Sequence, residues 1–265
     1  MSRETRRVLI TGGASGLGLA LAKAFLARGD EVLVGDLADE RPDDVPAEAA
    51  YRKLDVRSQQ DWDAALLEVK ERWRGLDVLV NNAGVATGGR IDVESFADWQ
   101  RVIDINLMGV VRGCQTFVPL LKEQGEGRIV NVASLAGLVH APAMSSYNTA
   151  KAGVVALSET LRFELAPFGI RVNVVCPAFF RTNLHTSLQG KDTEVEESAV
   201  KLITRAGPDG DVIAAKVMSG IDKDRKIILT DKTGYVASWA KRVARPAYDI
   251  AIGSSGLRLA KRGSL

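Results

Sequence analysis

Cysteine, histidine and long hydrophobic runs are scarce in this chain of 265 residues, and each shortage excludes a class of protein. Cys114 and Cys176 are too few for a disulfide framework, and both lie in apolar stretches, as buried, unreactive thiols usually do. Neither they nor the two histidines have metal-ligand spacing, so we expect no metal. No stretch has the roughly 18 uncharged apolar residues of a membrane span, and no apolar signal segment follows the basic N-terminus. We therefore expect a cytoplasmic protein.

Neither sign of charge dominates the chain, whose formal net charge is +2. The distribution is uneven, because residues 222–265 contain ten Lys or Arg and four Asp or Glu. That end carries a net charge of +6, which leaves −4 for residues 1–221. A solvated helical face explains the basic end, and we expect no nucleic-acid partner.

Short apolar runs alternate with longer helical patterns along most of the chain. Several runs are nearly continuous Val, Ile and Leu, as in strands buried on both faces of a parallel sheet. The predicted strands are Val8–Thr11, Glu31–Asp36, Ala50–Asp55, Val78–Asn81, Arg128–Ala133, Arg171–Cys176 and Lys226–Thr230. The predicted helices are Leu17–Arg28, Gln59–Trp73, Phe96–Glu123, Tyr147–Ala166 and Asp209–Ile221. The alternation predicts one α/β domain over residues 1–265, a Rossmann-like doubly wound parallel sheet of about seven strands with helices on both faces.

Two segments do not follow this alternation. Residues 183–207 are polar and follow a strand end, where ligands bind in such sheets, so they form either a substrate lid or a surface insertion. In the basic extension 231–265, Tyr235, Trp239 and Val243 recur every four residues with cations beside them. Such a helix can pack on its own domain, cover the substrate cleft or lie on an anionic bilayer. We expect packing, because the segment is short.

A glycine-rich turn, Thr11–Gly18, directly follows the first apolar run. Strand, glycine turn and helix in this order form an anion-binding arrangement, because the amides of the helix N-terminus face the ligand. Gly12 permits the tight turn, and Gly16 and Gly18 allow backbone and helix to approach a pyrophosphate. Leu17 begins the helix. The turn predicts a site for a dinucleotide cofactor.

Asp36 bears on the choice of cofactor. It closes the second predicted strand, eighteen residues after Gly18, about where an acid hydrogen-bonds the adenine ribose. Its carboxylate repels a 2′-phosphate, and no Arg or Lys sits in the glycine turn or immediately after Asp36 to pair with one. The sequence therefore favours NAD over NADP.

Tyr147 and Lys151 are four residues apart, which places a phenol and an ammonium on one face of a helix. Ser134 stands thirteen residues before Tyr147. A free tyrosine is a poor base near neutral pH, and a nearby cation lowers its pKa. Lys151, together with the positively charged nicotinamide of NAD⁺, can supply that charge, so that Tyr147 takes the proton of an alcohol while Ser134 holds the oxygen. Lys151 should also hydrogen-bond the nicotinamide ribose. Beside a dinucleotide site, this chemistry indicates hydride transfer.

These motifs resemble those of the short-chain dehydrogenase/reductase family, from Arg7 to about Thr182. The resemblance also covers Asp55-Val56, which in the family contacts the adenine. It further covers Asn81–Gly84, which in the family stabilises the sheet and runs alongside the cofactor. It extends to Asn106, for which it implies a role in positioning a water that links Lys151 to solvent.

The resemblance implies a catalytic set, a cofactor set and a homo-oligomer, either a dimer or a tetramer. The implied catalytic residues are Asn106, Ser134, Tyr147 and Lys151. The implied cofactor residues are Gly12, Ser15, Gly16, Leu17, Gly18, Asp36, Leu37, Asp55, Val56, Asn82, Ala83, Gly84, Tyr147, Lys151, Pro177, Phe180 and Thr182. Two features depart from the family pattern: Pro177-Ala178 stands where Pro-Gly is usual, and the glycine-rich C-terminal end is missing.

The sequence thus predicts an NAD(H)-dependent oxidoreductase that interconverts a secondary alcohol and a ketone. Apolar residues near the expected pocket favour a steroid-like, aromatic or lipid-derived substrate; they are Leu135, Val139, Phe179, Phe180 and Leu184. His140 and His185 either line that pocket or are ordinary loop residues. The alternatives are a catalytically silent NAD(H) sensor, in which Tyr147 or Lys151 would usually be lost, and a membrane-surface interaction protein.

Overall fold

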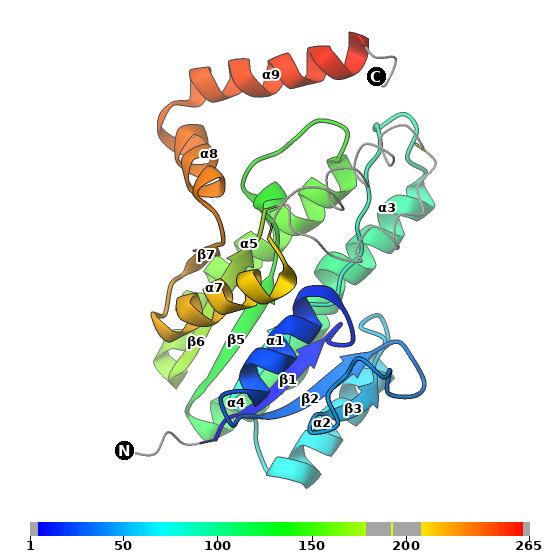
Figure 1. The fold of residues 1–265 in the computed structure, drawn as a ribbon, viewed down its shortest axis with the longest axis vertical. Coiled ribbons are helices and arrows are strands. Elements are labelled where there is room, and N and C mark those ends of the chain that lie inside the picture. The colour runs from blue at the N-terminus through cyan, green and yellow to red at the C-terminus, as the bar shows by residue number, and fades with distance from the viewer. Residues whose placement is uncertain (1–4, 179–191, 193–207, 262–265) are drawn as a thin grey trace.

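The computed structural model describes residues 5–178, 192 and 208–261. Within these residues seven strands form one parallel sheet in the order β3-β2-β1-β4-β5-β6-β7 (Figure 1). The strands are β1 (Arg7–Thr11), β2 (Glu31–Asp36), β3 (Ala50–Lys53), β4 (Val78–Asn81), β5 (Gly127–Val132), β6 (Ile170–Cys176) and β7 (Ile227–Leu229). The helices that cover the sheet are α1 (Gly16–Leu26), α2 (Gln59–Trp73), α3 (Phe96–Ile103), α4 (Gly109–Gln124), α5 (Ser145–Leu165) and α7 (Gly210–Asp222). The expected Rossmann-like doubly wound sheet is confirmed.

The strand order reverses at β1, which has β2 on one side and β4 on the other. Leu9 pairs in parallel with Leu33 of β2 and with Leu79 of β4. Because all strands run the same way, their carboxyl ends share one edge of the sheet. At such a reversal the two following crossovers leave in opposite directions and open a crevice, which is where open α/β sheets bind ligands.

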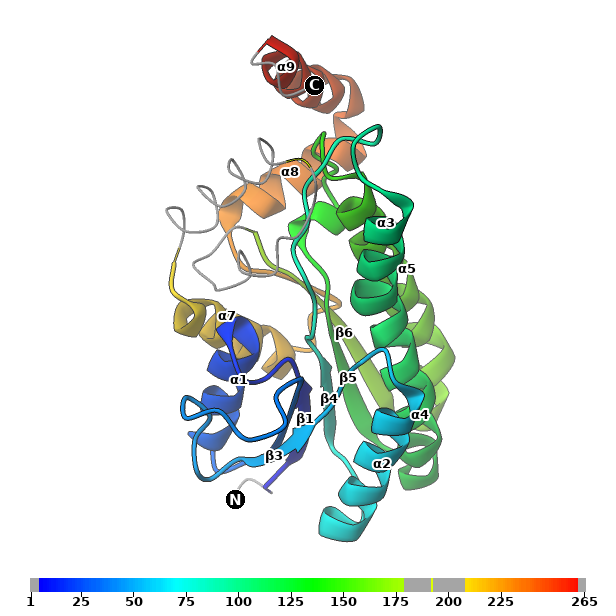
Figure 2. The same ribbon diagram turned by 90° about the vertical axis from the view of Figure 1, so that its right-hand side faces the viewer.

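Helices on the two faces give the sheet two separate hydrophobic cores (Figure 2). On one face α1 lies on β1 and β2, α7 lies on β7 and packs against α1, and Phe25 of α1 is fully buried in the core beneath them. On the other face α2, α4 and α5 enclose Trp62 and Phe117, whose rings meet edge to face with centroids 6.3 Å apart. Burial on both faces explains the nearly continuous apolar runs in the strands.

Two predicted elements are shorter or interrupted. Strand β3 ends at Lys53 instead of Asp55, because the amide of Asp55 donates to the Asp61 carboxylate (2.8 Å) and turns the chain into α2. The predicted helix Phe96–Glu123 is divided by the π-turn η1 (Asp104–Met108) between α3 and α4. A π-turn inserts an extra residue into the helical ladder, and such turns are frequent at functional sites.

After β7 the chain forms α8 (Lys232–Val243) and α9 (Arg245–Lys261), which together we call the arm. In both views α9 lies at the end of the molecule opposite the N-terminus (Figures 1 and 2). The expected packing of Tyr235, Trp239 and Val243 on the domain is wrong, since these side chains are 44%, 62% and 64% exposed. The helix rests on its opposite face, where Gly234 is buried against Leu135. No described helix is long and apolar enough to cross a membrane.

Candidate cofactor and catalytic site

The glycine turn is shaped by two positions where a side chain has no room. Gly12 has φ +61°, and a Cβ at Gly18 would lie 2.1 Å from the carbonyl oxygen of Gly12. Ser15 precedes α1, and its side chain makes no capping bond, so it leaves the first-turn amides open to a ligand. A helix N-terminus with open amides beside a crowded glycine turn fits the pyrophosphate of a dinucleotide.

The segment Asn82–Gly84 is bonded to this turn. The Asn82 side-chain amide donates to the carbonyls of Thr11 (2.9 Å) and Gly12 (3.0 Å), and its main-chain N–H donates to the Thr11 hydroxyl (3.0 Å). Ala83 N–H donates to the same hydroxyl (3.1 Å). These bonds hold the turn and the segment after β4 as one wall of the crevice.

Asp36 lies at the end of β2 with its carboxylate turned toward the glycine turn. One oxygen accepts from Ala14 N–H and the other from Leu37 N–H, both at 2.8 Å. Each carboxylate oxygen keeps a second lone pair, so the group can still accept bonds from a ribose. Sequence reasoning missed Lys53, which pairs with Asp36 across the sheet register and forms an ion pair with Asp39 (2.5 Å).

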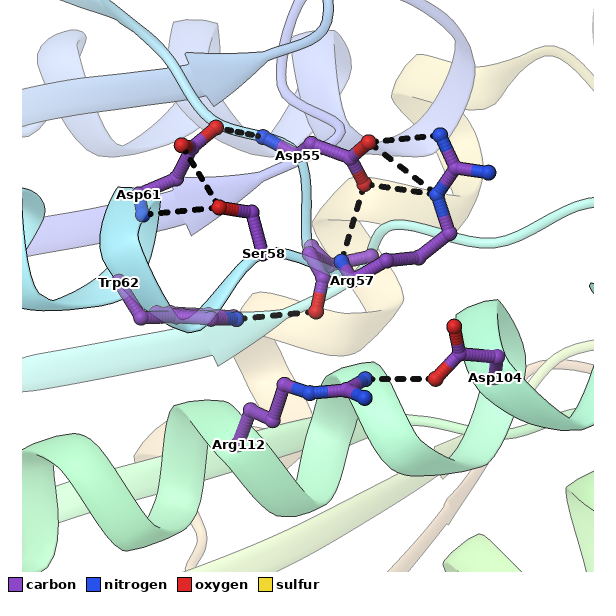
Figure 3. A network of polar contacts seen from close by, with 8 residues as sticks. Asp55, Arg57, Ser58, Asp61, Trp62, Asp104 and Arg112 are labelled. Atoms are coloured by element: carbon purple, nitrogen blue, oxygen red, sulfur yellow. Dashed lines mark hydrogen bonds and ion pairs between the residues drawn. The ribbon is translucent and has the colours of Figure 1, made fainter.

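Asp55 lies in a polar network between the end of β3 and α2 (Figure 3), and Val56 follows it in the chain. The Asp55 carboxylate accepts from the Arg57 guanidinium (2.6 Å) and main-chain N–H (2.9 Å), and these bonds hold the pKa of Asp55 below its ordinary value against the opposing effect of burial. The carbonyl of Val56 accepts from the Trp62 indole (3.1 Å). Asp55 and Val56, which we expect to face the adenine, are therefore held in place by hydrogen bonds within the chain.

Ser134, Tyr147 and Lys151 come together at the carboxyl end of β5. Ser134 lies after that strand, and Tyr147 and Lys151 lie on successive turns of α5. The Lys151 ammonium donates to the carbonyl of Val132 (3.0 Å) and lies 5.9 Å from the centre of the Tyr147 ring. Both side chains are buried, at 9% exposure for Tyr147 and 4% for Lys151. The sequence spacing therefore does bring these three groups together.

Burial dominates the electrostatics of the cluster. It raises the pKa of Tyr147 above its ordinary value, and a hydrogen bond with Ser134 opposes that rise. It also lowers the pKa of Lys151 to about 8, and it raises the pKa values of Cys114 and Cys176 to about 12. The pKa of Tyr147 is raised because loss of hydration outweighs the hydrogen bond with Ser134. Both thiols are buried and free, as expected.

Asn106 is fully buried in the π-turn η1. Its amide oxygen accepts from Val85 N–H (2.8 Å) and its amide nitrogen donates to the carbonyl of Val85 (2.9 Å). A Cβ at Gly84 would lie 2.8 Å from the Asn106 oxygen and 3.4 Å from the Lys151 ammonium nitrogen. In this structure both ends of the Asn106 amide thus hold the segment beside Lys151.

Two further contacts around the catalytic cluster were missed by sequence reasoning. Glu94 is 8% exposed, and one of its oxygens accepts from the hydroxyls of Ser146 (2.6 Å) and Thr87 (3.2 Å). This anchors the residue next to Tyr147. The segment after Ser134 is held by the arm, through Lys241 and Tyr248. No local sequence pattern marks either arrangement, because the partners are far apart in the chain.

The arm contacts the segment Leu135–His140 through two polar side chains. Lys241 donates to the carbonyl of Leu138 (2.7 Å), and the amide of His140 donates to the Tyr248 hydroxyl (3.1 Å). The Lys241 ammonium also lies 3.1 Å from Nδ1 and 3.2 Å from Nε2 of His140. Burial and this neighbouring charge lower the pKa of His140. A neutral ring has one acceptor nitrogen, so only one of those two contacts is a hydrogen bond at a time.

Several predicted residues lie outside the described part of the chain. They are Phe179, Phe180, Thr182, Leu184, His185 and all of 183–207 except Asp192. Asp192 is buried and accepts from the side chain (2.8 Å) and amide (3.0 Å) of Arg90. Pro177 is described, and its carbonyl accepts from Leu135 N–H (2.8 Å), which places it beside Ser134.

A glycine turn with open helix amides at the sheet reversal, next to a buried Ser-Tyr-Lys cluster, defines the class of nicotinamide-dependent oxidoreductases. The short chain dehydrogenase family model matches residues 6–193. The chain is 39% identical over 178 residues to the 3-alpha-(or 20-beta)-hydroxysteroid dehydrogenase of Mycobacterium bovis, covering 66% of this chain and 68% of that protein. It is 35% identical over 223 residues to the trans-4-hydroxycyclohexanecarboxylate dehydrogenase of Sinomonas cyclohexanicum, covering 74% and 86%.

A solved short chain dehydrogenase/reductase from Burkholderia phymatum, in complex with NAD, superimposes with a TM-score of 0.86 at 25% identity and covers 96% of each chain. The chain belongs to the short-chain dehydrogenase/reductase family. It is therefore an oxidoreductase of alcohols and ketones that binds a nicotinamide cofactor.

Proposed function

We propose that this protein is an NAD(H)-dependent dehydrogenase that interconverts an apolar secondary alcohol and its ketone. The proposal rests on one arrangement, the Tyr147 phenol bonded to Ser134 with the Lys151 ammonium a turn away. The bound nicotinamide supplies the acceptor for the hydride that leaves the carbinol carbon. The residues of the chain manage the hydroxyl proton and the substrate oxygen.

In oxidation, the Tyr147 phenolate takes the hydroxyl proton while the carbinol C–H bond breaks, which leaves a carbonyl. Ser134 donates to the substrate oxygen in both directions. Burial disfavours the phenolate, so formation of the base needs positive charge. In the proposal this charge comes from the Lys151 ammonium, 5.9 Å from the centre of the Tyr147 ring, together with the nicotinamide of NAD⁺. Lys151 has a second task in the proposal, which is to hold the nicotinamide ribose. Asn106 keeps the Gly84 segment close to Lys151. In the proposal, Asn106 also positions a water that relays the proton between Lys151 and solvent.

NAD, in place of NADP, is proposed from the Asp36 carboxylate. It lies at the end of β2 beside the glycine turn, where a 2′-phosphate would meet its charge. Lys53, the register partner of Asp36 on β3, is a candidate to neutralise such a phosphate, but Asp39 already pairs with it. Steady-state kcat/KM with each cofactor tests this assignment.

We expect wild type to prefer NAD, Asp36→Ser to move the preference toward NADP, and Asp36→Ser with Asp39→Asn to move it further, because Lys53 is then released. Asp39→Asn alone should change the preference least. A wild type that already prefers NADP would overturn the assignment.

The proposed substrate class is supported by the hydroxysteroid and hydroxycyclohexanecarboxylate dehydrogenases among the relatives. Leu135 and Val139, next to Ser134, add apolar surface to that side of the site. Turnover with NAD⁺ should be measured against hydroxysteroids, substituted cyclohexanols, aromatic carbinols and polyols. Activity confined to polyols would contradict the apolar assignment. We further propose that the enzyme is a cytoplasmic homo-oligomer.

A further inference from the structure

The first turn of α5 carries the proposed proton-transfer group, so the contacts that fix this turn bear on the reaction. Tyr147 is the third residue of α5, which begins at Ser145. Met144, at the N-cap, makes no side-chain capping bond, and the first turn contains no acidic residue. A helix start has unpaired amides and a partial positive charge, both of which favour a nearby carboxylate. In α5 that carboxylate comes from another part of the chain.

Glu94 supplies the carboxylate beside the start of α5. It directly precedes Ser95, the N-cap of α3, and it is buried. One of its oxygens accepts from the hydroxyl of Ser146 (2.6 Å) and from that of Thr87 (3.2 Å), and both of these residues are buried as well. The shorter distance is typical of a bond from a hydroxyl to a carboxylate, which is among the stronger hydrogen bonds in proteins. The second residue of α5, next to Tyr147, is thereby tied to the chain that follows β4.

Glu94 is itself held by the segment 87–94, which we call the strap. A Cβ at Gly89 would lie 2.5 Å from Cγ of Glu94, so the side chain packs closely over this glycine. The amide of Gly89 donates to the carbonyl of Ala143 (2.8 Å), and Arg90 forms an ion pair with Asp192 (2.8 Å). The strap therefore contacts the entry to α5 at two points, through Gly89 before the helix and through Glu94 in its first turn.

The backbone before α5 is strained at Ala143. Its φ of +58° lies in the left-handed region, which L-residues with a side chain rarely adopt. Such a conformation persists only where the surrounding structure imposes it, and it is found most often at functional sites. The bond from Gly89 of the strap is one contact that holds Ala143 in place, four residues before Tyr147. The start of the catalytic helix is thus set by its neighbours as well as by its own sequence.

The second oxygen of Glu94 indicates that this arrangement serves geometry more than stability. Among the described residues, that oxygen is buried and has no hydrogen-bond partner. A buried acceptor without a partner destabilises the fold, which offsets part of what the bonds to Ser146 and Thr87 contribute. Proteins tolerate such costs mainly at functional sites. We therefore expect Glu94 to add little to the net stability while it fixes the turn that carries Tyr147.

We propose that Glu94 is a positioning residue for the alcohol–ketone reaction and acts through Ser146 on the phenol of Tyr147. Glu94 bonds the turn that carries Tyr147, and so it sets the distance between the phenol oxygen and the substrate hydroxyl. A displacement of about 1 Å at a reacting group can lower the rate roughly 10²-fold. The inference rests on the proposed role of Tyr147 as the proton-transfer group.

The direct test compares Glu94→Leu with Glu94→Gln. Leucine removes both acceptor oxygens at similar volume, whereas glutamine keeps one oxygen for the Ser146 hydroxyl. We expect kcat of Glu94→Leu to fall roughly 10–100-fold while the dissociation constant of the preferred nicotinamide cofactor stays unchanged. Glu94→Gln should keep kcat within a few-fold of wild type.

The matched control is Glu68→Leu on α2, which removes another carboxylate bonded to two side chains, those of Arg52 and Arg72. This control should have the kcat of wild type. Rates are expressed per cofactor-binding site, so that a smaller folded fraction does not count as slower chemistry. Wild-type kcat in Glu94→Leu, or an equal loss in Glu94→Gln and Glu94→Leu, would overturn the proposal.

Ser146→Ala tests the route from Glu94 to Tyr147. It removes the hydroxyl that Glu94 accepts from, and we expect it to lower kcat as well. If both residues act through one bond, the double variant Glu94→Leu, Ser146→Ala is no slower than Glu94→Leu alone. Losses that multiply would mean that Glu94 acts by another route, which contradicts the proposal. If Glu94→Leu does not fold, Ser146→Ala still decides, because an unchanged kcat would refute the positioning role.

Two further measurements separate positioning from stability and from the proposed function. The melting temperature of Glu94→Leu should lie close to that of wild type, and its loss of kcat should persist well below that temperature. A loss of kcat that disappears on cooling would mean a structural role only and would overturn the proposal. Tyr147→Phe is measured in parallel. If Tyr147→Phe is inactive and Glu94→Leu is active, the positioning inference alone is wrong, whereas an active Tyr147→Phe removes the proposed role of Tyr147 and the inference with it.

Discussion

The cofactor crevice and the arm both follow the carboxyl ends of sheet strands, yet their side chains are held in different ways. In the crevice, Asn82, Asn106 and Lys151 each bond a main-chain group of another segment. In the arm, Trp239 and Leu257 stand largely in solvent. The crevice is completed within one chain and is preorganised for a ligand. In the part of the chain that the structure describes, the arm is bonded to the body through residues such as Lys241 and Tyr248, and its substitutions at exposed positions should cost the single chain less.

The largest effect should come from removing one oxygen atom inside the crevice. Tyr147→Phe keeps the ring and its packing but loses the group proposed to move the proton. We expect kcat to fall by roughly 10²–10⁴, with little change in cofactor affinity. Tyr235→Phe in the arm also removes a bonded hydroxyl, one that meets Arg225, and should leave kcat close to wild type. Activity of Tyr147→Phe within a few-fold of wild type would remove Tyr147 from the mechanism.

A second prediction uses the buried charge of Lys151. Its pKa is about 8 in the folded chain against an ordinary 10.5, so between those values the unfolded chain binds more protons. Stability from this group therefore rises as pH increases from about 8 toward 10.5, and below pH 8 the buried charge is a cost.

Lys151→Met should remove that cost. We expect the variant to gain about 1–3 kcal/mol of unfolding free energy at pH 7 while losing turnover and cofactor affinity. Denaturant melts of both proteins between pH 7 and 9.5 measure the difference. Parallel pH profiles for wild type and variant would mean that the lysine is not desolvated as the structure indicates.

A third prediction compares a crowded glycine in the crevice, Gly18, with an uncrowded one outside the glycine turn, Gly210. A Cβ at Gly18 would lie 2.1 Å from the Gly12 carbonyl, whereas one at Gly210, the first residue of α7, would meet its nearest atom at 3.6 Å. Gly18→Ala should cost about 1–3 kcal/mol of stability by overpacking and weaken NAD binding. Gly210→Ala should be neutral or slightly stabilising. Equal effects of the two substitutions on thermal unfolding would contradict the crowding at Gly18.

The sequence predicted the cofactor crevice better than it predicted the arm. The crevice is built from short motifs at strand ends, so the glycine turn, Asp36 and the Tyr147–Lys151 pair were found from spacing alone. The π-turn at Asn106 was missed, because an extra residue in a helical ladder leaves the apolar pattern nearly unchanged. Lys53 was missed because only the register of β2 and β3 places it opposite Asp36.

The arm was predicted as a helix but with the wrong face inward. The apolar side of α8 indicated burial, and sequence alone does not say whether the covering surface belongs to the same chain. The inward face carries Gly234 and Lys241, which have no apolar pattern. Their partners, Leu135 and Leu138, lie about a hundred residues earlier in the chain, so no local signal connects them.

The smallest predicted effect lies where the two regions meet. Lys241 donates to the carbonyl of Leu138, four residues after Ser134, so it is placed to position the segment beside the reacting oxygen. Lys241→Met keeps most of the stem but loses that bond, which is worth about 0.5–1.5 kcal/mol. Because the contact is partly exposed, we expect the lower end of that range in unfolding free energy and a few-fold increase in KM with kcat nearly unchanged. Arg242→Met, on the exposed side of the same helix, is the control and should leave KM alone. If Lys241→Met and Arg242→Met gave the same KM, the arm would have no part in shaping the substrate site of its own chain, and the boundary between the two regions would fall at β7.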